Sequence, residues 1–100
     1  MTLTAHSRVV VSDDQVSTSV GGEAVILGMH DGVYYGLDPL GARLWELVRT
    51  PRAISELVDV IVAEFDVTRT QCETDALALM ADLIARGLVR EAPPVSAPGA

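Results

Sequence analysis

Short runs of apolar and β-branched residues predict strands in the first third of the chain. Apolar, β-branched or hydroxyl side chains dominate four short runs, at 8–12 (RVVVS), 15–20 (QVSTSV), 23–29 (EAVILGM) and 33–37 (VYYGL). The Gly21-Gly22 pair interrupts the chain after the second run, and Asp31-Gly32 separates the last two. Because Asp-Gly between two apolar runs is typical of a tight turn, we expect a β-hairpin there and one more strand before it.

From Asp38 onward, apolar residues recur at helical spacing. Asp38 can cap a helix whose first position is Pro39, where the missing N–H costs nothing. Helices are expected from Asp38 to Thr50, from about Ala53 to Phe65, and from Thr68 or Thr70 to about Arg86. Strands followed by helices predict an α+β fold of winged-helix-like outline, with a three-stranded antiparallel sheet followed by a three-helix bundle.

The C-terminal residues mark the end of the predicted domain. Gly87 suits the end of the third helix, and Leu88-Val89 is expected to fold back onto the core. The segment 92–100 (APPVSAPGA) is rich in Pro, Ala and Gly and is expected to be disordered. We therefore predict one domain over residues 1–91 and a tail over 92–100.

Composition and charge exclude several classes of function. The chain of 100 residues is 49% hydrophobic, which suffices for one core, and its net charge is -7. Its seven basic residues are outnumbered by fourteen acidic ones, which disfavours nucleic-acid binding. The N-terminus does not resemble a signal peptide, and no apolar run approaches the roughly 18 residues of a membrane helix. We expect a cytoplasmic protein with no nucleic-acid or membrane partner.

Residues suited to catalysis or metal binding are sparse. The two histidines, His6 and His30, have no Ser or Cys at a suggestive spacing, and the single cysteine, Cys72, is expected to be a small buried hydrophobe. No Gly-rich phosphate loop is present, and the carboxylates fall on the polar faces of amphipathic helices. We expect no catalytic residues, no metal and no cofactor.

The third predicted helix is apolar over an unusually wide arc. At 100° per residue, its apolar side chains spread over roughly 180°, wider than one-sided packing requires; they are Cys72, Ala76, Leu77, Leu79, Met80, Leu83 and Ile84. Asp75, Asp82 and Arg86 form a polar strip beside this arc. Two interpretations stay open: the helix is central and buried on two sides, or one edge of the arc lines a groove.

The predicted strand at 33–37 lacks the usual protection of a sheet edge. It contains no charge and no proline, and Gly36 permits close approach of another backbone. An unprotected edge favours either a dimer partner or a peptide that adds a strand.

The run Y-G-L-D-P-L-G-A-R-L-W, Tyr35 to Trp45, resembles the strand-to-helix junction of PqqD-like proteins, the precursor-peptide recognition elements of ribosomally made, post-translationally modified peptide pathways. Further matches are ISEL at 54–57, FDV at 65–67, and 75–83 leading to GLV at 87–89. Asp38 and Leu44 replace the Asn and Ile of the family pattern. The resemblance covers about Val25 to Val89 and is greatest to the free-standing leader-binding protein of lasso peptide biosynthesis.

The resemblance implies a non-catalytic protein that binds a leader peptide as an added antiparallel strand. The backbone ladder would come from Val33, Tyr34, Tyr35, Gly36 and Leu37. The third helix would supply apolar pockets at Ala76, Leu79 and Leu83, with Asp75, Asp82 and Arg86 on the rim. Four of the junction's side chains are expected in the core instead: Tyr35, Leu37, Leu44 and Trp45. Tyr34 is either a ligand contact or an exposed ring.

The implied partners are the leader segment of a precursor peptide, a separate cysteine-protease-type leader peptidase and a cyclase. Three alternatives remain. A PqqD-like peptide chaperone for a radical SAM enzyme would share the fold. A homodimeric winged-helix module could use the same open edge. A winged-helix DNA-binding protein is disfavoured because the third helix carries Asp75 and Asp82.

Overall fold

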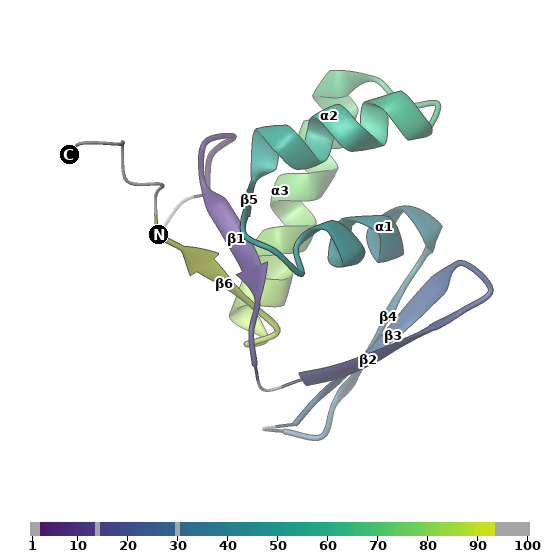
Figure 1. Cartoon of the computed structure of the whole chain (residues 1–100), viewed down its shortest axis with the longest axis vertical. Coiled ribbons are helices and arrows are strands. Elements are labelled where there is room, and N and C mark those ends of the chain that lie inside the picture. Colours follow the sequence, from purple (N-terminus) through teal and green to yellow (C-terminus); the bar gives the residue numbers. More distant parts are fainter. Residues whose placement is uncertain (1–2, 14, 30, 94–100) are drawn as a thin grey trace.

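A computed structural model of the chain describes residues 3–13, 15–29 and 31–93. It contains two three-stranded sheets and three α-helices (Figure 1). In chain order the elements are β1 Arg8–Val11, β2 Gln15–Val20, β3 Glu23–Gly28, β4 Tyr34–Leu37, α1 Pro39–Leu47, β5 Arg52–Ala53, α2 Ile54–Glu64, α3 Arg69–Ala85 and β6 Val89–Ala92. The predicted α+β class, antiparallel sheet and three helices are confirmed.

Two hairpins build the β2-β3-β4 sheet. Gly21 and Gly22 both have positive φ (59° and 85°) and form the two-residue turn between β2 and β3, where the sequence predicted only a chain break. The predicted hairpin at Asp31-Gly32 is confirmed: β3 pairs with β4, and Gly32 also has positive φ (70°).

The second sheet joins segments far apart in the sequence. β1 lies in its middle, with β5 on one side and β6 on the other, so that Arg8 pairs with both Ala53 and Ala92. Leu88 and Val89 are buried, which confirms that the chain folds back onto the core after α3. β6 extends to Ala92, which is buried although it was predicted to begin the disordered tail. Residues 94–100 of that tail lie outside the described residues.

Local capping groups define the ends of α1 and α3. The Asp38 carboxylate accepts a hydrogen bond from the Gly41 amide (2.8 Å), and the Thr68 hydroxyl accepts one from the Gln71 amide (3.2 Å). At the end of α3, Gly87 has φ 75° and the Leu88 amide donates to the Leu83 carbonyl (2.9 Å), which satisfies the last turn. The predicted caps are confirmed.

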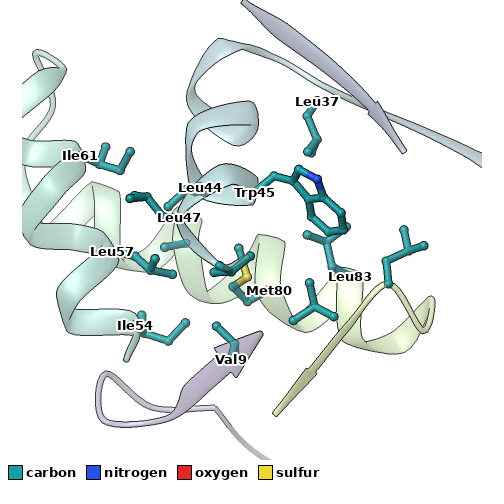
Figure 2. Close-up of a cluster of buried hydrophobic side chains, with 14 of the residues drawn as sticks. Val9, Leu37, Leu44, Trp45, Leu47, Ile54, Leu57, Ile61, Met80 and Leu83 are labelled. Atoms are coloured by element: carbon teal, nitrogen blue, oxygen red, sulfur yellow. The ribbon is translucent and has the colours of Figure 1, made fainter. Parts of the chain in front are cut away.

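The hydrophobic core lies where the three helices meet the two sheets (Figure 2). Leu37, Leu44 and Trp45 are buried in it as predicted, and so is Cys72. The Trp45 indole N–H donates to the Ser17 hydroxyl (3.0 Å), which fixes the β2-β3-β4 sheet against α1. No helix in the described part of the chain is long and apolar enough to cross a membrane.

Candidate functional site

β4 forms an open edge of its sheet. Within the described residues it pairs with β3 on one side and with nothing on the other. The Val33 carbonyl, just before β4, accepts a hydrogen bond from the Gly28 amide (3.0 Å). Because backbone direction alternates along an antiparallel strand, Tyr35 and Leu37 also direct their N–H and C=O groups toward β3. The N–H and C=O groups of Tyr34 and Gly36 therefore point to the open edge.

The side chains of β4 divide between the two faces of the sheet. Leu37 is buried and Tyr35 half-buried on the inner face, whereas Tyr34 lies on the outer face and is 70% exposed. Gly36 also faces outward, and a Cβ atom built there meets no heavy atom within 4 Å. The two residues whose backbone groups point to the open edge are thus both exposed.

The residues of α3 that were predicted to line the site do not all reach the surface. Ala76 is 1% exposed and Leu83 0%, and both belong to the core, so the prediction that they offer pockets to a ligand is wrong. Their spacing with Met80 puts all three on the helix face that packs inward. Asp75 and Arg86 are exposed, and Leu79 and Asp82 are half-buried.

The wide apolar arc of α3 reflects burial on more than one side. Leu77, Leu79 and Ile84 are partly buried and pack against the core cluster that contains Ala76 and Leu83. Of the two interpretations left open by the sequence, the central helix accounts for most of the arc. Leu79 is the one predicted pocket residue of α3 that keeps part of its side chain at the surface.

Three side chains form a clasp between β4 and α3. The Tyr35 hydroxyl donates a hydrogen bond to Asp82 Oδ2 (2.6 Å), and Arg86 Nε lies 3.3 and 3.4 Å from the two Asp82 carboxylate oxygens. The Arg86 guanidinium carbon also lies 4.8 Å from the centroid of the Tyr35 ring, within the range of a cation–π contact. Among the described side chains, Tyr35–Asp82 is the one hydrogen bond between the β2-β3-β4 sheet and α3.

This Tyr35–Asp82–Arg86 clasp shifts the ionisation of its members. The hydrogen bond from Tyr35, and after it the charge of Arg86, holds the pKa of Asp82 below its ordinary value. The same hydrogen bond, with partial burial, raises the pKa of Tyr35. Both shifts favour a neutral hydroxyl beside an ionised carboxylate, the state in which the clasp is complete.

Replacing Tyr35 by phenylalanine is expected to raise the pKa of Asp82 toward its ordinary value, because the lost hydrogen bond is the main cause of the lowering. In the wild-type protein the ionised carboxylate contributes stability above the ordinary Asp pKa, and this contribution is lost as the pH falls through the lower folded-state pKa. The Tyr35 contribution is lost in the other direction, as the pH rises through a folded-state pKa above 10.0. An NMR titration of the Asp82 carboxyl carbon measures the first effect; an unchanged midpoint in Tyr35→Phe would contradict it.

The small cavity at the clasp is too tight for a side chain. It measures about 10 Å³ and is lined by Asp31, Val33, Tyr35, Arg86 and Leu88. The clasp thus closes the space between β4 and α3 at the C-terminal end of α3. The sequence analysis assigned Tyr35, Asp82 and Arg86 to the site but predicted no contact among them. Two signals of that contact were available: the side chain of Tyr35 was expected to face inward, and Asp82 and Arg86 are four residues apart on a helix.

Chemical groups suited to catalysis do not gather in the described part of the chain. No set of three or more His, Cys, Asp or Glu side chains there could hold a metal ion. Burial raises the pKa of the Cys72 thiol, which keeps it protonated and poorly nucleophilic at neutral pH. Among the described residues, β4 instead presents backbone N–H and C=O groups at a sheet edge where no other strand pairs with it.

Comparisons with known proteins identify the family and the fold of the chain. The sequence model described as "Coenzyme PQQ synthesis protein D (PqqD)" matches residues 23–89. The solved structure of TbiB1 in complex with the TbiA(beta) leader peptide is 34% identical, has a TM-score of 0.75, and is matched over 81% of this chain and 94% of its own. A lasso peptide synthetase B1 complexed with the leader peptide shares the fold at 20% identity, with a TM-score of 0.73 over 82% and 96% of the two chains. No curated protein matches the sequence significantly.

Proposed function

The chain belongs to the PqqD family and is a PqqD-like recognition element of a ribosomal peptide pathway, and from this premise we propose that it captures the leader segment of a precursor peptide. The client is a lasso peptide precursor, and the bound leader is presented to a separate cysteine-protease-type leader peptidase. The similarity to TbiB1, whose structure contains a leader peptide, supports leader binding, and the shared fold of a lasso peptide synthetase B1 agrees with the choice of client. The protein acts in this proposal by binding and not by catalysis.

The observation that carries the proposal is the open edge of β4. A leader strand alongside it would meet two outward N–H and two outward C=O groups, those of Tyr34 and Gly36. Each such hydrogen bond contributes about 0.5–1.5 kcal/mol net, and an apolar side chain that becomes fully buried adds roughly 1.5–3 kcal/mol. After about 2–5 kcal/mol for ordering the leader, a dissociation constant in the micromolar to nanomolar range follows.

The binding surface in this proposal comprises β4 and the exposed edge of α3. Val33 to Leu37 supply backbone, and the Tyr34 ring supplies an apolar contact on the outer face. Leu79 is the apolar contact on α3, with Asp75, Asp82 and Arg86 on the rim. Ala76 and Leu83 contribute by supporting the helix from within the core.

Capture of the leader assists the peptidase by proximity. A peptidase that binds another face of this protein meets the cleavage site at a high effective concentration, because the leader is held on the same particle. The trimmed peptide then passes to the cyclase. The role of this chain is therefore to concentrate and orient a flexible substrate.

A fluorescence-anisotropy titration tests the proposed function. The probe is the labelled leader of the precursor encoded beside this chain, and saturable binding at micromolar concentration or tighter is expected. A peptide of the same composition in scrambled order is the control. Absence of binding, with circular dichroism showing a folded protein, would contradict leader recognition. Sedimentation of the free protein shows whether a second copy already occupies the edge.

A further inference from the structure

The guanidinium of Arg86 is held in place through its Nε atom and its contact with the Tyr35 ring, while its two terminal nitrogens are not bonded to other described residues. Its Nε atom is directed to Asp82, and its guanidinium plane lies over the Tyr35 ring. Within the described residues neither of its terminal nitrogens, Nη1 and Nη2, has a hydrogen-bond partner. The side chain remains 47% exposed. The Nη1 and Nη2 atoms of a fixed guanidinium are thus presented to solvent beside β4.

Arg43 differs from Arg86 in the number of its nitrogens that bind carboxylates of the protein. Its Nε and Nη2 atoms bind the two oxygens of Glu64 at 2.9 Å each, and its Nη1 atom binds Glu46 at 3.0 Å. All three nitrogens of Arg43 are therefore bonded within the protein, whereas Arg86 is bonded, within the described part of the chain, through Nε alone. Arg52, like Arg86, is held through its Nε atom, which donates to the Leu47 carbonyl (2.8 Å), but it lies on β5 in the other sheet.

We propose that the terminal nitrogens of Arg86 bind the carboxylate of an aspartate or glutamate side chain in the bound leader, an inference that rests on the proposed function. Asp82 and Tyr35 act as positioning residues that fix the guanidinium. A planar guanidinium with two parallel donors matches a carboxylate in geometry and charge. The subsite lies at the C-terminal end of α3, next to the first residues of β4, Tyr34 and Tyr35.

The surrounding charge makes such a contact selective. The chain carries a net charge of -7, so an acidic side chain is repelled over most of the surface and attracted where a cation is held in place. Asp31 lines the same small cavity as Arg86, but its Oδ1 atom accepts the Val33 amide (3.1 Å) and it forms no ion pair with Arg86. A leader carboxylate would therefore be the second anion at Arg86, after Asp82.

The test is a double-mutant cycle between protein and leader. Arg86→Gln is expected to weaken leader binding about tenfold, and Arg86→Lys to restore little of it, because an ammonium group lacks the two parallel donors. In the leader, each acidic residue is changed singly to its amide. One of these changes should weaken binding to the wild-type protein by a similar factor and have no further effect on Arg86→Gln.

Arg90→Gln is the matched control, since it removes the same charge from an exposed position on β6 and should change binding less than twofold. Tyr35→Phe should cause a smaller loss than Arg86→Gln, because the ring remains beneath the guanidinium. Normal binding by Arg86→Gln, or a leader whose acidic residues can all be neutralised without effect, would overturn the subsite and leave the proposed function standing. Failure of the wild-type protein to bind the unmodified leader would instead overturn the proposed function.

Discussion

Replacing Leu83 by aspartate is expected to unfold the domain. The Leu83 side chain is completely buried and points from α3 into the cluster that contains Trp45 and Met80 (Figure 2). Truncation of such a leucine to alanine alone costs about 2–5 kcal/mol, and a carboxylate in apolar surroundings adds a desolvation penalty. Because small domains have a total stability of about 5–15 kcal/mol, most of the variant should be unfolded at room temperature. Circular dichroism and a thermal melt measure the loss.

Ala78→Asp provides the matched control for this experiment. Ala78 lies on the same helix but is exposed, so the same carboxylate should change stability by no more than about 0.5 kcal/mol. If Leu83 instead lined a peptide-binding groove, the Leu83→Asp variant would stay folded and bind the leader more weakly. That outcome would contradict the burial of Leu83 and restore its assignment to the binding surface.

Replacing Gly36 by proline is expected to weaken leader binding at least about tenfold and to leave the domain folded. The Gly36 amide points to the open edge and makes no bond to β3, so proline removes a donor that only a ligand strand would use. The proline ring also occupies the space that the incoming backbone would enter. Loss of one hydrogen bond of about 0.5–1.5 kcal/mol, together with this steric clash, accounts for a change of at least tenfold, which corresponds to about 1.4 kcal/mol.

Gly36→Ala separates the donor from the side chain. A Cβ atom at this position meets no neighbour within 4 Å, and alanine keeps the amide N–H, so its leader affinity should stay within about threefold of the wild-type value. Both variants are compared by anisotropy, with circular dichroism as the check on folding. Equal affinities for the proline and alanine variants would show that the leader does not pair with β4.

The sequence predicted well those features that depend on neighbouring residues. The period of the apolar side chains, the Asp38 and Thr68 caps and the turn at Asp31-Gly32 located the helices and one hairpin. The Gly21-Gly22 turn was also readable, because two adjacent glycines suit a turn with two positive φ angles. These signals depend only on neighbouring residues, and the structure has the caps and turns that they indicate.

Features that depend on distant residues could not be read in the same way. A helical wheel shows that Leu79 and Leu83 lie on one side of α3, but only the packing of the rest of the domain around α3 decides that Leu83 is buried and Leu79 partly exposed. The clasp joins Tyr35 to Asp82, which lies 47 residues further along the chain. The β5-β1-β6 sheet likewise joins three segments that no local pattern connects.

The two sheets should differ in when they form during folding. The β2-β3-β4 sheet pairs strands that are neighbours in the sequence, so each hairpin closes only a short loop. β1 can meet β6 only after nearly the whole intervening chain has been brought together. The nascent chain would therefore display the edge of β4 before the sheet of β1 and β6 has closed the core. The open edge of β4 is thus also exposed to other unfolded chains, with which it could pair and aggregate. Rapid packing of the helices around Trp45 would shorten the time during which such pairing can occur.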